Sequence, residues 1–261
     1  MKTHMKITFL GTGTSVGIPV IGCDCGVCKS RDPRNQRRRS SLHVEAGGYH
    51  IVIDTSMDFR EQVLAYKVPR IDAVLITHSH ADHIFGLDDI RRFNTIQGTL
   101  IPVYGSAGAI ADLKRIFAYV DQSIPEPGVF RPRLDFCTLS GSFMAGPVKV
   151  EALPVLHGRT ETCGYRLEWE GHTLGYVPDC KEMPESTIKR FVGVDVMILD
   201  GLRHRSHPTH LTVEAALALL GRIGAKRSYL THICHDLDHE ETQESLPPSV
   251  YVACDGMKLN L

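Results

Sequence analysis

The sequence predicts an α/β fold in which short buried strands alternate with amphipathic helices. Three apolar runs, at 71–76, 101–104 and 194–199, have the length and composition of buried strands. Each run is followed along the chain by a segment in which apolar residues recur at helical spacing. The chain has 261 residues, 43% of them hydrophobic, which suffices to bury a large core. We therefore expect a single domain over residues 1–261.

The composition argues against several classes of protein. The formal net charge is −1, so the molecule as a whole has no field that would attract a polyanion. No apolar run approaches the ~20 residues of a membrane span, and the first residues lead into a strand rather than a signal peptide. Eight cysteines fit a reducing compartment in which thiols stay free or bind metal. We expect a cytoplasmic protein without membrane contact.

The amino-terminal half is expected to begin with strands and to continue with alternating helices and strands. The glycine-rich loop at 10–15 lacks both the P-loop lysine and a G-x-G-x-x-G match, so we interpret it as a tight turn. Around it we expect a strand at 7–10, a hairpin with strands 42–45 and 51–54, and helices at 58–66, 88–94 and 106–120. Residues 121–147 contain several prolines and little periodicity, which predicts a long loop or an irregular hairpin.

The carboxyl-terminal half is richer in predicted strands. The expected elements are a strand at 148–152, a hairpin of 164–168 and 172–176, the strand 194–199, a helix at 213–220, a strand at 227–230, and closing strands at 250–253 and 257–259. Thr212 is a suitable cap for the helix that follows it, as Ser106 is for the helix in the first half. We expect His239 at the surface.

The stretch T-H-S-H-A-D-H at 77–83 holds the densest group of metal-binding side chains. It directly follows the first of the three buried strands, where catalytic loops are common. His78 and His80 are two residues apart, so in an extended loop they point the same way and can share one metal. Asp82 and His83 follow a turn and can face a second metal, and both ligand types suit zinc, iron or manganese. The pattern predicts a metal centre rather than an inert surface loop.

Three cysteines form a second candidate metal site. Cys23, Cys25 and Cys28 fall within six residues and are one ligand short of a tetrahedral zinc site. Free or redox-active thiols are the alternative reading, whereas a disulfide is not expected in a reducing compartment. The fourth ligand has to come from elsewhere in the chain. The Cys-rich loop at 23–28 is thus a candidate structural zinc site.

Further polar residues follow predicted strands or precede predicted helices. They are His157, Asp179, His207, His210, His232 and His235. A lone histidine is usually structural, so position alone assigns none of these residues. The basic run Arg37-Arg38-Arg39 is compatible with a solvated loop or with an anion-binding rim, since arginine binds phosphate through paired hydrogen bonds.

The H-x-H-x-D-H pattern at 78–83 resembles the signature of the metallo-β-lactamase superfamily. The other ligands of that superfamily follow in order, and its motifs span residues 7–235. The resemblance implies an αββα sandwich of two mixed sheets flanked by helices, with two divalent metals at one edge. It assigns the ligands to one metal (His78, His80 and His157), to the other (Asp82, His83 and His232), and to a bridge (Asp179 with a water or hydroxide). Asp54 would support the ligands without binding metal.

A second resemblance is narrower. The C-x-C-x-x-C pattern and the H-x-x-H at 232–235 together resemble the accessory zinc site of the phosphoribosyl 1,2-cyclic phosphate phosphodiesterases, the phosphonate-pathway branch of the superfamily. His235 would be the missing fourth ligand of the cysteines. The lactamases proper carry a cysteine near the position of Asp179, so the aspartate argues against an antibiotic hydrolase.

The resemblance implies a metal-dependent phosphodiesterase that hydrolyses small cyclic phosphodiesters through the bridging hydroxide. Two active-site metals, zinc or manganese and less typically iron, and one structural zinc are expected. His210 would assist the leaving group or contact the phosphate, and His207 is its rival. Asp82 is counted with both histidines as a catalytic candidate.

Three other functions fit the sequence less well. An RNase Z-type tRNA 3′ endonuclease would share the metal centre, but the near-zero net charge and the absence of a long basic arm argue against a tRNA substrate. A thioester hydrolase like glyoxalase II does not fit the cysteine insertion. A non-catalytic metal-binding module should have lost some ligands. We expect a small phosphodiester as the partner, and a homodimer is compatible with the sequence.

Overall fold

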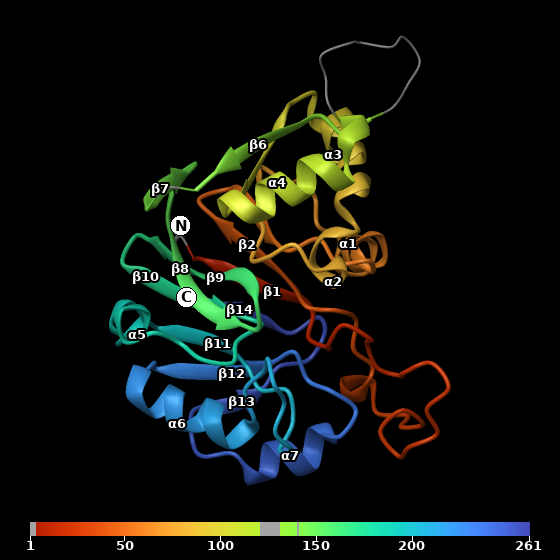
Figure 1. Cartoon of the computed structure of the whole chain (residues 1–261), viewed down its shortest axis with the longest axis vertical. Helices are drawn as coiled ribbons and strands as arrows, with labels where there is room; N and C mark the ends of the chain where they lie inside the picture. Colours follow the sequence, from red (N-terminus) through yellow and green to blue (C-terminus); the bar gives the residue numbers. More distant parts are fainter. Residues whose placement is uncertain (1–3, 121–130, 140) are drawn as a thin grey trace.

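Two β-sheets pack face to face and carry helices on their outer faces (Figure 1). The computed structural model describes residues 4–120, 131–139 and 141–261. In these residues each sheet has seven strands. Both sheets mix parallel and antiparallel pairs, which confirms the predicted αββα sandwich of two mixed sheets.

The first sheet is built almost entirely from the amino-terminal half. Its strands are β1 (Lys6–Gly11), β2 (Ser41–Ala46), β3 (Tyr49–Ile53), β4 (Ala73–Leu75), β5 (Ile101–Gly105), β6 (Leu134–Thr138) and β14 (Lys258–Asn260). They lie in the order β14-β1-β2-β3-β4-β5-β6. β3 to β6 run parallel, whereas β14, β1, β2 and β3 pair antiparallel.

The second sheet comes from the carboxyl-terminal half. Its strands are β7 (Ser142–Ala145), β8 (Val148–His157), β9 (Thr160–Trp169), β10 (His172–Val177), β11 (Val196–Asp200), β12 (Arg227–Thr231) and β13 (Val250–Val252). They lie in the order β13-β12-β11-β10-β9-β8-β7. β10 to β13 run parallel and β7 to β10 antiparallel.

The helices fall into two groups at opposite ends of the molecule in Figure 1. The first group comprises α1 (Phe59–Tyr66), α2 (Ala81–Ile84), α3 (Ile90–Gln97) and α4 (Ala107–Ile116), and the second α5 (Glu185–Phe191), α6 (Val213–Ile223) and α7 (His239–Ser245). The caps are as predicted, because Ser106 accepts from the N–H of Ala109 and Thr212 from that of Ala215. None of the described helices is long and apolar enough to cross a membrane.

Three apolar clusters hold the layers together. The central cluster lies between the sheets and joins side chains such as Phe9 and Val44 from the first sheet to Tyr165 and Tyr176 from the second. A second cluster packs α5 and α6 onto the second sheet, and a third packs α3 and α4 onto the first. Because the opposite sheet and the helices cover both faces of strands such as β4 and β11, these strands appear in the sequence as continuous apolar runs.

The structure differs from the sequence-based expectation in several elements. The segment 121–147 was expected to be a long loop or an irregular hairpin, but it contains β6 and β7, which belong to different sheets; residues 121–130 and 140 lie outside the described residues. α5 and α7 were not predicted. The two closing strands belong to different sheets, β13 to the second and β14 to the first. Short segments of this kind carry too few residues for a clear period.

Strand direction places several loop residues at one edge of the sandwich. β10, β11 and β12 are parallel, so the chain leaves all three at the same edge. β8 is antiparallel to β9, which is antiparallel to β10, so β8 also ends there. This edge of a mixed α/β sheet is where ligand sites commonly form.

Candidate metal centre

The first ligand group consists of His78, His80 and His157. Their candidate ligand nitrogens lie within 4.8 Å of one another. Neighbouring groups fix two of the three rings: the hydroxyl of Thr77 lies 3.0 Å from Nδ1 of His78, and Nδ1 of His157 donates to the carbonyl of Thr209 at 2.9 Å. Nε2 of each of these rings is therefore free to face the cluster.

The second ligand group consists of Asp82, His83 and His232, whose ligand atoms are also within 4.8 Å of one another. Nε2 of His83 is 3.3 Å from Oδ2 of Asp82, and Nε2 of His232 is 3.9 Å from the same oxygen. All three side chains are buried. The loop at 77–83 therefore supplies members of both groups, as its spacing predicted.

Asp179 lies between the two groups. One carboxylate oxygen is 3.3 Å from Nε2 of His83 in the second group. The other is 3.9 Å from Nε2 of His78 and 3.7 Å from Nε2 of His157 in the first group, and 3.5 Å from that of His232. Asp179, two residues after β10, thus contacts nitrogens of both ligand groups.

Asp54 supports the centre from behind, at the end of β3. Its carboxylate contacts Nδ1 of His83 at 2.7 Å and accepts hydrogen bonds from the backbone and the hydroxyl of Thr77, both at 2.8 Å. Asp54 is fully buried and adopts a positive φ of 63°. A carboxylate on the far nitrogen orients the ring, so Asp54 acts on His83 in the way that the resemblance implied.

The electrostatics of this cluster suit divalent cations. Nε2 of His83, Nε2 of His232 and Oδ1 of Asp179 are buried without a hydrogen-bond partner, which is unusual for native polar atoms. Burial lowers the pKa of His83, but the charges of Asp179, Asp54 and Asp82 outweigh it and raise that pKa well above its usual value. The carboxylates thus attract positive charge, and imidazoles and carboxylates are donors that zinc or manganese accepts.

His210 faces the centre from the loop before α6. Nε2 lies 3.9 Å from Oδ2 of Asp179, and Nδ1 lies 2.7 Å from Oδ2 of Asp200, the last residue of β11. The ring stacks on that of His232 at 4.6 Å between centroids. The same Asp200 oxygen accepts from the N–H of Cys180, so it also fixes the segment that carries Asp179.

His207 lies farther out than His210. Its ring centroid is 5.0 Å from that of His210, and its Nδ1 faces the N–H and the hydroxyl of Thr209. The ammonium of Lys181 donates to the carbonyl of His207 at 2.7 Å and lies 3.4 Å from that of His210. Of the two candidates, the geometry favours His210 as the residue next to the metal centre.

The three cysteines of the 23–28 loop meet His235. Nδ1 of His235 is 3.2, 3.5 and 3.6 Å from the sulfurs of Cys23, Cys25 and Cys28. The N–H of Cys28 donates to the sulfur of Cys25, which lowers the pKa of Cys25 to about 6. Burial raises the pKa of Cys28 to about 11. Three thiols and an imidazole within 4.8 Å of one another form a donor set that suits tetrahedral zinc.

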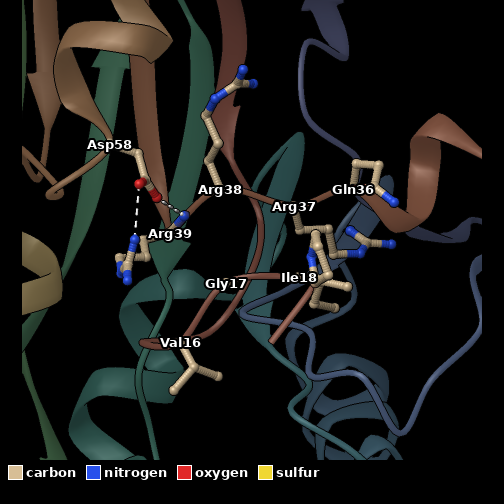
Figure 2. A pocket seen from close by; sticks show the side chains of 9 residues that line it. Val16, Gly17, Ile18, Gln36, Arg37, Arg38, Arg39 and Asp58 are labelled. Carbon is tan, nitrogen blue, oxygen red and sulfur yellow. Dashed lines mark hydrogen bonds and ion pairs between the residues drawn. The ribbon is translucent and has the colours of Figure 1, made fainter. Parts of the chain in front are cut away.

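The basic run lines a cavity, and its Arg37 and Arg39 are held by protein partners. Figure 2 shows this run beside a cavity of about 280 Å³. The cavity is lined by residues 16–19 and 36–39 and by Asp58. Arg37 is only 2% exposed; it donates to Thr12 and contacts Nδ1 of His239 at 3.1 Å. Arg39 pairs with Asp58 at 2.8 Å. The expectation that His239 lies at the surface is therefore wrong, because it is buried against Arg37.

Sequence reasoning missed two residues that shape the site. Asp200 was seen only as the end of a strand, although it follows a buried apolar run just as 77–83 does. Lys181 gave no sequence signal, because its partners are backbone carbonyls 26 and 29 residues away. Contacts of this kind depend on tertiary structure alone.

The amino-acid sequence matches a family model described as the beta-lactamase superfamily domain over residues 49–233. The chain belongs to the metallo-β-lactamase superfamily. The match covers the metal loop, Asp179 and His232, which are the residues that the geometry brings together. The Cys-rich loop at 23–28 lies before it.

Within the superfamily, the chain falls in the PhnP-like branch. A crystal structure described as a new diphosphatase from the PhnP family is 38% identical, covers 99% of this chain and 97% of that one, and superposes with a TM-score of 0.91. The short form of human tRNase Z (20% identical, 98% of both chains, TM-score 0.72) shares the fold. Membership of this branch makes the chain a metal-dependent hydrolase.

A third relative is a longer protein. An octanoyltransferase of Porphyromonas gingivalis is 35% identical over 259 residues, which is 97% of this chain but 51% of that protein. The chain thus spans about half the length of that relative.

Proposed function

We propose that this hydrolase cleaves small phosphodiesters, with cyclic phosphodiesters as the favoured class, at a centre of two divalent metals. The observation that carries the proposal is the position of His210, which is held by Asp200 and lies 3.9 Å from Asp179. A histidine of this kind suits a reaction in which an oxygen leaves phosphorus and needs a proton or a contact.

Different side chains would bind each metal and assist the leaving group. His78, His80 and His157 would hold one metal, Asp82, His83 and His232 the other, and Asp179 both. Bound zinc or manganese would supply a nucleophile near neutral pH and neutralise phosphoryl charge. Because Nδ1 of His210 faces Asp200, its Nε2 is the ring atom left to exchange a proton with the leaving oxygen or to contact the phosphoryl group.

The description of one relative suggests a second kind of substrate. One structure of the same branch is described as a diphosphatase. In a disubstituted diphosphate each phosphorus carries two substituents, as the phosphorus of a cyclic phosphodiester does. In both cases one P–O bond is broken and the developing charge lies on the phosphoryl oxygens. Disubstituted diphosphates are therefore the second substrate to test.

The accessory site belongs to the same proposal. Cys23, Cys25, Cys28 and His235 would bind one structural zinc within a single domain of residues 1–261. All eight cysteines are free thiols, which suits a reducing compartment such as the cytoplasm.

An RNase Z-type endonuclease remains the competing activity, since human tRNase Z has the same fold. The net charge of −1 disfavours it, because a tRNA-binding protein gains much of its affinity from phosphate contacts with basic residues. A precursor tRNA is therefore included in the assay as the rival substrate.

The test is a substrate panel with the zinc- or manganese-loaded protein. It comprises bis(p-nitrophenyl) phosphate, a ribose cyclic phosphate, a dinucleoside diphosphate and a precursor tRNA. We expect turnover of the cyclic ester, and we expect Asp179→Asn to abolish it while Arg92→Met, an exposed change on α3, does not. Cleavage of the precursor tRNA alone would overturn the proposal.

A further inference from the structure

A two-residue turn brings an arginine to the edge of the metal centre. β8 and β9 pair up to His157 and Thr160, and Gly158 and Arg159 form the turn between them. Gly158 has a φ of +61°, which glycine adopts readily at the first position of tight hairpin turns. Both flanking residues touch the cluster, because Nε2 of His157 is 3.7 Å from Asp179 and the hydroxyl of Thr160 is 3.0 Å from Nε2 of His80.

The other side of this turn faces the loop that carries His210. A Cβ on Gly158 would lie 3.0 Å from the methyl group of Thr209, so the turn and the loop are in close contact. The carbonyl of Thr209 also accepts the hydrogen bond from His157. Arg159 therefore lies in a turn whose other residues contact both the ligand cluster and the loop of the leaving-group histidine.

The other cations around this edge already have partners. Lys181 donates to backbone carbonyls of the His207–His210 loop. Arg203 and Arg205 both lie within 4.0 Å of Asp236. Arg159 is exposed, and its side chain has no ion pair or hydrogen bond among the residues that the structure describes. Among the described residues it is thus a positive charge without a protein partner, in a turn next to the centre.

A guanidinium without a protein partner is available to an anion that enters the site. Phosphate is the anion that a guanidinium matches best, since it accepts two parallel N–H···O bonds.

We propose that Arg159 binds a second phosphoryl group of the substrate, one that is not attacked at the metals. This inference rests on the proposed function and deepens it. Arg159 is a specificity residue that favours substrates with two phosphoryl groups over singly charged diesters. A diphosphate and a cyclic phosphodiester that carries a separate phosphate both offer this chemistry.

The experiment compares Arg159→Met and Arg159→Lys with wild type, and uses Arg92→Met on α3 as the matched control for an exposed arginine. The substrates are a dinucleoside diphosphate, a ribose cyclic phosphate with and without a separate phosphate group, and bis(p-nitrophenyl) phosphate. Loss of a charge-assisted pair predicts a KM about 10- to 100-fold higher for the two-phosphoryl substrates in Arg159→Met. We expect kcat to change little, a much smaller effect on the singly charged substrates, and partial retention in Arg159→Lys.

A binding measurement separates this proposal from the proposed function. Calorimetry with methylenediphosphonate, a diphosphate analogue whose P–C–P bridge is not hydrolysed, should give a weaker Kd for Arg159→Met and an unchanged one for Arg92→Met. Equal affinity of wild type and Arg159→Met overturns the inference, whether or not any phosphodiester is turned over. A similar loss on all substrates also overturns it. Comparing the turnover of the dinucleoside diphosphate with that of the phosphorylated cyclic ester then shows which of the two substrates the protein prefers.

Discussion

Single hydrogen bonds decide which nitrogen of each histidine faces the centre. Asp54 occupies Nδ1 of His83, and Asp200 occupies Nδ1 of His210, so Nε2 of both rings points inward. The sequence identified these histidines, because ligand types and spacing are local features. It could not assign the partners, since Asp54 lies 29 residues from His83. Ring orientation follows from contacts that only the folded chain makes.

The first residue-scale prediction concerns the pair of His210 and Asp200. His210→Ala should lower kcat on the cyclic ester by about 10²- to 10⁴-fold, the usual contribution of an acid–base group. Asp200→Asn should lower it by about 10- to 100-fold, because the ring loses its orienting carboxylate. The measurement is steady-state kinetics with elemental analysis of each variant.

The double variant and a second substrate make this prediction specific. The two losses should not add, since both act through one ring. The loss should also be smaller for bis(p-nitrophenyl) phosphate, whose leaving group needs no proton. His207→Ala is the control. If kcat falls as far in His207→Ala as in His210→Ala, the assignment of this role to His210 is wrong.

The second residue-scale prediction concerns Lys181. Its ammonium holds the carbonyls of His207 and His210, so Lys181→Met should loosen the loop without removing a ligand. We expect a kcat about 10-fold lower, comparable to the loss of an orienting partner. Lys189→Met, on α5, is the control. An unchanged kcat in Lys181→Met would mean that the loop keeps its position without the hydrogen bonds from Lys181.

At the scale of elements, the loop between β1 and β2 is fixed to the carboxyl-terminal half by polar contacts. The side-chain amide of Asn35 donates a hydrogen bond to the carboxylate of Asp238, and Arg37 contacts His239 at the start of α7. Arg37 also donates to the backbone carbonyl of Ala253. The sequence showed a basic run but not its burial, because a charged side chain is rarely buried unless partners from distant segments satisfy it.

The prediction at this scale is that Arg37 stabilises the fold. Arg37→Met should lower the free energy of unfolding by about 2–4 kcal/mol, because buried acceptors lose a charged donor. The exposed Arg31 in the same loop is the matched control, and Arg31→Met should have little effect. Denaturant titration of the loaded protein provides the measurement, and equal midpoints for both variants would contradict this account of Arg37.

For the whole molecule, one edge of the sandwich gathers ligands from segments far apart in the chain. His78 follows a strand of the first sheet. In the second sheet, His157 ends β8, and Asp179 and His232 follow β10 and β12. The fold class could be predicted because strand and helix periods are strong over long segments. β6, β7, α5 and α7 could not, because they are short and their place is set by packing against the sheets.

The two metal sites meet at the carboxyl end of β12. His232 faces the catalytic cluster, and His235, three residues on, faces the cysteines. Metal at the cysteine site would thus tie the amino-terminal loop to a strand of the active site and contribute to folding. Cys25→Ser should therefore lower the melting temperature of the loaded protein, and Cys137→Ser, on β6, should not.

Counting the metals tests the central claim most directly. Elemental analysis of the purified protein should give about three metal ions per chain in wild type, two at the catalytic cluster and one at the Cys₃His site. Cys25→Ser should hold about two, and Asp179→Asn should lose metal while it keeps the zinc of the cysteine site. If wild type holds no more metal than Cys25→Ser, or if Asp179→Asn loses none, the two-site account is wrong.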